Sequence, residues 1–320
     1  MSASLIAWLP LALLAAVSLL CFVGCVLRST GDVPPFTNYR GTIQGDPNLV
    51  AFWPLGEMPG ETTAHDIQGG HDGTYTAVAD PGYPTIPPPP GEAPSAKANG
   101  TFTLGATGIV QGDGVGDDPA SLNTCMKTDG GYVSVPFDAA INPTGAFTIE
   151  AWVRVEWTGD DEAAFRTVID ARAVDGGSRG FALYATPDNH WEVWLGNGGT
   201  GMTGRAIATT PDPFPMSLEG VTFYLAASFD GSMLRIFSDG EQRASVAMSV
   251  YAPNDDVSPH VPSPLYIGAG APWLPTGGPI PPGGPRWPFR GKIQDVAVYN
   301  AALDQAVILK HKHNGDGTDP

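Results

Sequence analysis

The sequence contains few cysteines and few basic residues, and each shortage excludes a class of protein. Cys21 and Cys25 both lie in an N-terminal apolar run, which leaves Cys125 alone in the rest of the chain. A single cysteine among scattered histidines provides neither a disulfide framework nor the set of about four ligands that a structural zinc site needs. The 16 Lys and Arg residues are outnumbered by 33 Asp and Glu, and the net charge of −17 repels phosphate backbones. Nucleic acid is therefore excluded as a partner.

Charged residues are scarce as well, at 15% of the 320 residues, whereas 41 glycines and 32 prolines are present. This composition favours short strands joined by many turns. Residues 147–155 (FTIEAWVRV) alternate apolar and other side chains, which predicts a half-buried strand. Trp152 falls on the side opposite Phe147 and Ile149, so another element must cover it unless it is exposed. Comparable runs separated by Asp-Gly pairs, without a fixed-period repeat, predict an all-β fold of two packed antiparallel sheets.

The N-terminal part of the chain has no charged residue between positions 5 and 27. As a helix, this run is long enough to cross a hydrocarbon core of about 30 Å. No basic residue precedes it, in contrast to a secretory signal. We therefore predict that residues 1–28 form a transmembrane anchor or signal segment, and a retained single-pass transmembrane helix is favoured.

Two features of this segment leave alternatives open. Residues 22–25 (FVGC) resemble a bacterial lipobox, so a lipoprotein modified at Cys25 is the alternative to a transmembrane helix. Packing of Cys21 and Cys25 within the helix is the simpler interpretation. The basic residues Arg28 and Arg40 favour a cytoplasmic domain, but long domains are translocated largely regardless of charge, and we predict an extracytoplasmic location.

The rest of the chain divides into a polar linker, one large domain and a short tail. Two proline-rich stretches inside the domain are expected to be extended surface insertions, because proline cannot donate ladder hydrogen bonds. A short helix is predicted over 301–312, after the last strand. The predicted boundaries are 29–47 for the linker, 48–312 for the domain, 80–99 and 272–288 for the insertions, and 313–320 for the tail.

Five stretches, taken in order, resemble a known family. They are 48–57 (NLVAFWPLGE), 131–136 (GYVSVP), 147–153 (FTIEAWV), 227–231 (ASFDG) with Asp239-Gly240, and 289–300 (FRGKIQDVAVYN) with Ala302-Leu303. Together they are similar to the LamG-like, concanavalin A-like jelly-roll domain. The resemblance implies a two-sheet antiparallel jelly-roll sandwich, usually exported, that binds carbohydrate or protein and in some members carries Ca²⁺.

The resemblance also implies candidate ligands for Ca²⁺, a cation that prefers carboxylate and carbonyl oxygens. Glu57, Asp66, Asp72 and Asp295 fall in the family segments where the terminal strands come together, and Glu57 and Asp295 are the preferred ligands. The alternative is that Glu57 and Asp66 cap turns and that Asp295 is a surface residue. Gln294 is a departure, because the family often has an acidic residue there.

Sugar recognition needs aromatic rings that stack on pyranose faces, with polar neighbours that bind hydroxyl groups. Trp157, Trp273 and Trp287 fall in or near predicted loops, and Trp194 shares a strand with Trp191 but points to the opposite face. We predict ligand contacts for Trp157, Trp194, Trp273 and Trp287. Packing in the core or anchoring of a loop is the alternative for each.

Catalysis is not predicted. A glycoside hydrolase needs two carboxylates on either side of the scissile bond, but Glu150 and Glu156 lie far apart on their strand, and 160–162 (DDE) is typical of a solvated turn. Residues 176–180 (GGSRG) match the nucleophile-elbow pattern, yet a strand and not a helix is predicted to follow.

The sequence therefore predicts a non-catalytic binding or adhesion module, held at the membrane by residues 5–27. Its expected partner is a polysaccharide or a protein at the cell surface. A structural subunit of a membrane or cell-surface assembly is the alternative, and a glycoside hydrolase ranks third.

Overall fold

The structure, a computed structural model, describes residues 39–77, 100–113, 123–157, 165–173, 178–200, 204–214, 220–257, 259–270 and 287–318. The chain divides into two units, Met1–Thr37 and Asn38–Pro320, and every described residue belongs to the second unit. Within these residues, no helix is both long and apolar enough to cross a membrane. The predicted anchor at 5–27, Cys25, Trp273, the insertion at 80–99 and most of the insertion at 272–288 lie outside the described residues.

Two antiparallel sheets form the second unit, as the sequence predicts. Sheet A contains β1 (Leu49–Trp53), β4 (Thr101–Thr107), β5 (Thr124–Asp129), β7 (Phe147–Val155), β12 (Thr222–Phe229), β13 (Met233–Ser238), β14 (Glu241–Ala247) and β16 (Arg290–Tyr299). Sheet B contains β2 (Thr63–Ala64), β3 (Gly73–Thr76), β6 (Tyr132–Val135), β8 (Arg166–Asp170), β9 (Phe181–Ala185), β10 (Trp191–Gly196), β11 (Arg205–Thr209) and β15 (Leu265–Ile267). The helical elements are α2 (Tyr39–Gln44), η1 (Gln111–Asp113), η2 (Ala139–Ile141) and α3 (Gln305–Asp316).

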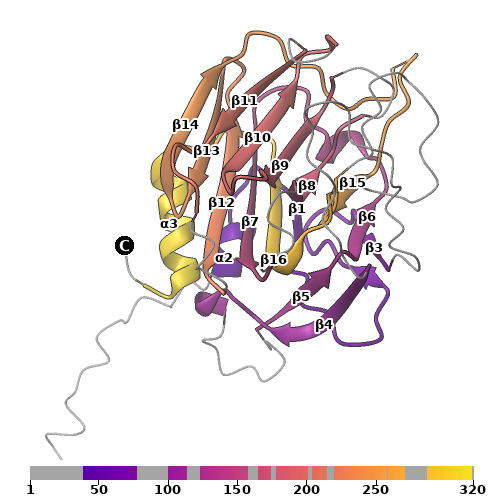
Figure 1. The fold of residues 1–320 in the computed structure, drawn as a ribbon, viewed down its shortest axis with the longest axis vertical. Coiled ribbons are helices and arrows are strands. Elements are labelled where there is room, and N and C mark those ends of the chain that lie inside the picture. The colour runs from indigo at the N-terminus through magenta and orange to yellow at the C-terminus, as the bar shows by residue number, and fades with distance from the viewer. Residues whose placement is uncertain are drawn as a thin grey trace, which may run out of the picture. The chain divides into compact units, whose positions relative to one another are not determined.

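The order of the strands differs from their order in the sequence. Sheet A runs β14-β13-β12-β7-β16-β5-β4, with β1 paired to β16, and sheet B runs β11-β10-β9-β8-β15-β6-β3-β2. Figure 1 shows the two layers side by side, with β16 inside sheet A between β7 and β5. The centre of sheet A is therefore completed by the last of the described strands.

Apolar side chains fill the space between the two sheets. β7 directs Phe147, Ile149 and Val153 into this space, since alternate residues of a strand share one face. Its neighbour β12 adds Leu225 and Ala227 in register, and the alternation read from the sequence is thus confirmed for the inward face.

The outer face of sheet A is covered by α2 and α3 (Figure 1). Tyr39 and Ile43, one turn apart on α2, are buried against Trp152 of β7 together with Ile308 of α3. The prediction of a linker over 29–47 is therefore wrong for the residues of α2. The prediction of a half-buried strand is also wrong for β7, because the helices bury its outer side as well.

Helix α3 extends beyond its predicted end. It begins after Asp304, whose Oδ1 accepts a hydrogen bond from the Val307 N–H at 2.9 Å. It ends at Gly317, which has φ 67°, so the tail predicted over 313–320 is helical as far as Asp316. A Cβ atom at Gly315 would lie 2.0 Å from Cζ2 of Trp152, and this contact shows that the helix covers the indole.

Glu150 joins both helices to the sheet. Its carboxylate is buried and accepts hydrogen bonds from the hydroxyls of Tyr39 (3.0 Å), Tyr224 (2.6 Å) and Tyr299 (2.9 Å), and the His311 Nδ1 lies 3.0 Å away. Burial by itself raises the pKa of Glu150, but His311 and the tyrosine hydroxyls lower it below its ordinary value. Burial lowers the pKa of His311, whereas Glu150 raises it, and the net pKa is raised. The pair is therefore stabilised in its charged form.

Candidate ligand-binding pocket

Trp157 lies in the core and not in an open loop. Its side chain is 1% exposed, and its ring meets that of Phe289 edge-on, with 5.5 Å between centroids. The Arg166 guanidinium lies 4.3 Å from the ring centroid. Trp157 comes two residues after the inward-facing Val155, so the chain continues to direct its side chain toward the core. The expectation of an accessible ring is wrong for Trp157.

Trp194 and Trp287 both contact Arg172 on the outer face of sheet B. The guanidinium carbon lies 5.5 Å from the Trp194 ring centroid and 4.7 Å from that of Trp287, and the Arg172 Nε donates to Asp170 at 2.8 Å. Trp194 is 2% exposed, and Trp287 is half-buried. Trp191 points into the core instead, so the predicted opposite facing of the two β10 tryptophans is confirmed. Trp194 presents no open ring to solvent.

Three of the four acidic residues predicted to bind Ca²⁺ lie in one region, where their carboxylates accept hydrogen bonds from the turns. Asp66 accepts several backbone N–H groups and the His71 Nδ1 at 2.8 Å. Asp72 accepts the Asp66 N–H at 2.8 Å, and Glu57 accepts the His65 N–H at 2.8 Å. Burial raises the pKa of Asp66, but the backbone hydrogen bonds and His71 lower it below its ordinary value. Much of the acceptor capacity of these carboxylates is therefore occupied.

Asp295 is buried beside two other charged side chains, those of Arg40 and Asp113. It lies at a bulge of β16 with φ 53°, and the Arg40 Nε is 3.1 Å from its carboxylate and 3.0 Å from that of Asp113. Burial raises the pKa of Asp295, and Asp113 adds to this effect while Arg40 opposes it. Asp295 is thus not a surface residue. The described residues include no group of three or more His, Cys, Asp or Glu side chains that could hold a metal ion, and Ca²⁺ binding stays a prediction.

A pocket of about 410 Å³ lies where β10 and β12 begin and the β13–β14 hairpin turns. Its volume falls within the range of about 300–1,000 Å³ that is usual for ligand pockets. We call it the end pocket. Its lining residues are Trp191, Thr210, Asp212, Pro213, Phe214, Phe223, Ser238, Asp239, Glu241 and Arg243.

Three aromatic rings form the apolar wall of the end pocket. The Trp191 ring stacks on Phe214 with 4.8 Å between centroids and an interplanar angle of 28°. Phe223 meets Trp191 at 5.5 Å and Phe214 at the same distance. The indole Nε1 of Trp191 is buried and has no hydrogen-bond partner within the described part of the chain. Trp191 is 2% exposed and Phe214 and Phe223 are each 8% exposed, so the rings form the buried base of the pocket.

Local sequence explains how the wall is built. β11 ends at Thr209, and Pro211 and Pro213 follow, which cannot donate hydrogen bonds to a neighbouring strand. The chain turns there and brings Phe214 back onto Trp191, where the Phe214 N–H donates to the Asn189 carbonyl at 2.8 Å. The two prolines thus end the strand and let the following residues form one side of the pocket.

Charged side chains surround the mouth of the end pocket. The Arg243 Nη1 lies 3.1 Å from Glu241, and its Nη2 lies 3.7 Å from Asp212. The side chains of Asp212 and Glu241 are 79% and 69% exposed. Asp239 forms the hairpin turn with φ 55°, and burial raises the pKa of its carboxyl. The mouth therefore offers many hydrogen-bonding atoms with an excess of negative charge.

The residues of the end pocket are absent from the sequence-based candidates. Trp191 is recognised there only as the partner of Trp194, and Asp239 only as a turn residue. Phe214 and Phe223 carry no motif, and they meet Trp191 only because three segments far apart in the chain converge. Glu241 and Arg243 are two residues apart on a strand that follows an Asp-Gly turn, so the sequence predicts that they share one face. It does not predict that this face lines a pocket.

Comparisons with known proteins identify a family and several similar folds. The sequence model of the concanavalin A-like lectin/glucanases superfamily matches residues 127–309, more than half of the chain. No curated protein matches.

Similar solved structures include a CBM40 module, a sialidase and a neurotoxin. The CBM40 module of the Ruminococcus gnavus IT-sialidase, bound to α2,3-sialyllactose, is 19% identical over 52% of this chain and 82% of that chain, with a TM-score of 0.39. A Trypanosoma rangeli sialidase in complex with sialic acid is 13% identical over 86% and 34%, with a TM-score of 0.48. A botulinum neurotoxin type C structure, whose cell entry depends on two ganglioside molecules, is 11% identical over 86% and 53%, with a TM-score of 0.47. These likenesses carry no conclusion about ligand or activity.

Proposed function

Because the chain belongs to the concanavalin A-like lectin/glucanases superfamily, we propose that it binds carbohydrate in the end pocket and acts without catalysis. The observation that carries this proposal is the mouth of the end pocket, where Asp212, Glu241 and Arg243 surround a depression above buried aromatic rings. A sugar carries a periphery of hydroxyls, and the polar side chains at this mouth can donate hydrogen bonds to them and accept hydrogen bonds from them.

The charges at the mouth favour a neutral or amino-bearing sugar over an acidic one. Arg243 is the only cation that lines the end pocket within the described residues, and it already contacts Glu241 and Asp212. An acidic sugar would have to approach these carboxylates and compete for Arg243. The net charge of −17 adds a long-range repulsion of the same sign.

The same geometry supports binding and not hydrolysis. A glycosidase needs one carboxylic acid kept protonated in a dry site while a second carboxylate remains charged. Asp212 and Glu241 are instead mostly exposed, and both contact the same guanidinium. Neither is placed in a dry site that would hold a proton for transfer. Burial raises the pKa of Asp239, but its Oδ1 accepts the Tyr224 N–H at 3.1 Å and serves the hairpin turn.

The proposal is tested by titrating the full chain with neutral oligosaccharides of the cello, xylo, manno and chito series, with glucosamine, and with sialyllactose. We expect saturable binding to at least one neutral or amino sugar and none to sialyllactose. Arg243→Ala and Glu241→Gln are expected to weaken that binding by about tenfold each, which corresponds to about 1.4 kcal/mol. Asp256→Asn removes an exposed carboxylate outside the pocket and serves as the matched control.

Two results would contradict the proposal. One is the absence of binding to every sugar, combined with stoichiometric recovery of protein partners from membranes, which would favour a structural subunit. The other is binding that Arg243→Ala and Glu241→Gln leave unchanged. Release of reducing sugar from β-glucans would instead establish a hydrolase.

We further propose that residues 5–27 anchor the domain at a membrane with the end pocket outside the cell. The support is the uncharged apolar run itself. Mass spectrometry of the mature N-terminus distinguishes the intact anchor, which starts near Met1, from a chain that starts at a lipidated Cys25. A mature chain that starts after residue 28, without lipid, would contradict both forms of attachment.

A further inference from the structure

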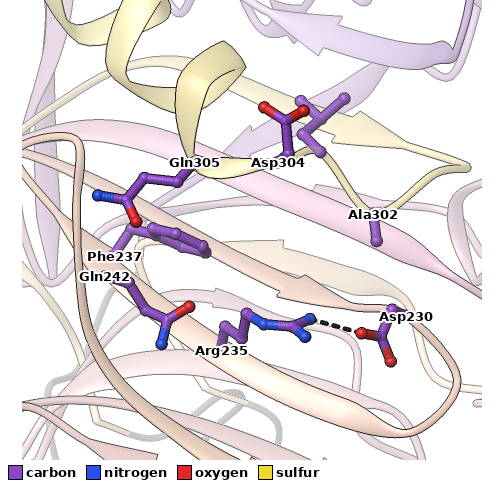
Figure 2. A pocket seen from close by; sticks show the side chains of 8 residues that line it. Asp230, Arg235, Phe237, Gln242, Ala302, Asp304 and Gln305 are labelled. Atoms are coloured by element: carbon purple, nitrogen blue, oxygen red, sulfur yellow. Dashed lines mark hydrogen bonds and ion pairs between the residues drawn. The ribbon is translucent and has the colours of Figure 1, made fainter.

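A second pocket of about 330 Å³ lies on the outer face of sheet A, beside the first turn of α3. Figure 2 shows Gln305 reaching from the helix toward Phe237 and Gln242, with Arg235 on the strands opposite and Asp304 at the start of the helix. We call it the helix pocket. It is separate from the end pocket, since the two share no lining residue.

The helix pocket has an apolar floor and two idle carboxamides. Phe237 is almost fully buried and lies beneath the pocket, directly across from Gln242 in the ladder of β13 and β14. The side chains of Gln242 and Gln305 are exposed, and neither makes a hydrogen bond to the described part of the protein. Each carboxamide offers two donors and one acceptor oxygen, so together they can bind adjacent hydroxyls of one ligand.

The charged groups of the helix pocket already have hydrogen-bond partners within the protein. The Arg235 Nη1 donates to Asp230 at 2.7 Å, and that carboxylate also accepts the Ser232 and Met233 N–H groups at 2.9 Å, which fixes its position. Asp304 caps α3 and complements the positive end of its dipole. With two carboxylates and one guanidinium, the pocket has no net positive charge for a phosphate or a carboxylate ligand. A neutral ligand rich in hydroxyl groups fits it best.

The two pockets lie on opposite sides of one hairpin. On β14, Glu241 and Arg243 line the end pocket, whereas Gln242 between them lines the helix pocket. On β13, Phe237 lines the helix pocket, whereas Ser238 lines the end pocket. This division follows from the strand geometry, in which successive side chains point to opposite faces.

From this arrangement we infer that the helix pocket is a second sugar-binding site, so that each chain holds two neutral sugar units on either side of the β13–β14 hairpin. The inference rests on the proposed function of the end pocket. Two sites on one rigid element raise the avidity for a polysaccharide, because binding of a second unit becomes intramolecular after the first has bound.

The test is an equilibrium titration of the full chain with the neutral cello-, xylo-, manno- and chito-oligosaccharides, read out as stoichiometry by calorimetry. The wild type is expected to bind two short oligosaccharides per chain. The double variant Gln242→Ala/Gln305→Ala is expected to bind one and to keep its sensitivity to Arg243→Ala. Gln68→Ala, a change at an exposed glutamine outside both pockets, is expected to retain two. Since both altered side chains are exposed, the unfolding midpoint is expected to stay unchanged.

The outcomes separate the two proposals. A wild-type stoichiometry of one that Arg243→Ala abolishes would overturn the helix pocket and keep the end pocket. Binding that only the double glutamine variant abolishes would overturn the end pocket and keep the helix pocket. A double variant that still binds two molecules overturns the second site, and absence of binding to every oligosaccharide overturns both.

Discussion

Two glutamates on the strands of sheet A, Glu150 and Glu241, lie in opposite environments. Beneath α2 and α3, Glu150 is buried and receives three tyrosine hydroxyls and His311. At the end pocket, Glu241 is mostly exposed, and its carboxylate lies 3.1 Å from the Arg243 Nη1. Both are glutamates on strands of the same sheet, and they differ in how completely the protein itself satisfies them.

This difference separates structural from ligand-binding roles. A buried carboxylate with every acceptor position filled has nothing left to offer a ligand, and its loss leaves its partners unpaired. An exposed carboxylate beside an aromatic wall keeps its hydrogen-bonding capacity free.

The largest expected effect comes from making the same substitution in both regions. Glu150→Gln is expected to lower the free energy of unfolding by about 3 kcal/mol, because it breaks a buried charged pair and leaves tyrosine hydroxyls short of acceptors. Glu241→Gln is expected to change it by less than about 0.5 kcal/mol. Urea denaturation of both variants near pH 6 measures this difference, and equal losses would remove the distinction between the regions.

The covering of Trp152 by α3 predicts a smaller effect. Gly315→Ala gains up to about 1 kcal/mol of helix propensity, but the new Cβ would lie 2.0 Å from Cζ2 of Trp152, and such overpacking costs about 1–3 kcal/mol. A net loss of stability is therefore expected in thermal unfolding. A variant that is more stable than the wild type would show that the helix is not packed tightly on the sheet.

The pair of Glu150 and His311 predicts a dependence on pH. The folded pKa of His311 is raised above its ordinary value of 6.5, so its contribution is fully present below pH 6.5 and is lost as the pH rises through the folded pKa. The folded pKa of Glu150 is lowered below its ordinary value of 4.5, so its contribution is present above pH 4.5 and is lost as the pH falls through the folded pKa.

The pair therefore contributes most between about pH 4.5 and 6.5. In this window, the His311→Gln variant is expected to have a lower free energy of unfolding than the wild type. As the pH rises above 7, the free energy of unfolding is expected to fall by less in the variant than in the wild type. The measurement is the free energy of unfolding of both proteins as a function of pH. Parallel profiles on the alkaline side would refute the charged state assigned to His311.

Calcium is expected to give the smallest effect. Binding at Glu57, Asp66 or Asp72 would stabilise the folded state by mass action, but these carboxylates already accept hydrogen bonds, and Asp295 already contacts Arg40. We expect addition of Ca²⁺ to raise the free energy of unfolding by less than about 1 kcal/mol. A larger rise that a chelator reverses would establish a metal site in this region.

Much of the fold follows from local patterns in the sequence. The alternation of 147–155 and the Asp-Gly turns are short-range signals, and they give the sheets, the core-facing side of β7 and the hairpins. Helix α2 is missed because only Tyr39 and Ile43 mark its buried side in a short polar and glycine-containing stretch. The partners of Glu150 are missed for a different reason, since Tyr39 and His311 lie 111 and 161 residues away from it.

The candidate sites depend even more on distant segments. Period-two alternation correctly places Trp191 and Trp194 on opposite faces, but it does not show that Arg172 covers one or that Phe214 stacks on the other. The position of Trp157 after a strand predicts a loop, whereas its alternation with Val155 continues into the core. Pocket volume is a property of side chains from several segments, and no single stretch of sequence contains it.

The position of β16 constrains the order of assembly. This strand lies between β7 and β5, so sheet A stays divided into two halves until residues 290–299 are available. Contacts between segments so far apart in the chain form late, because the intervening loop must close first. A chain that is still being synthesised therefore cannot complete sheet A before its C-terminal region is released.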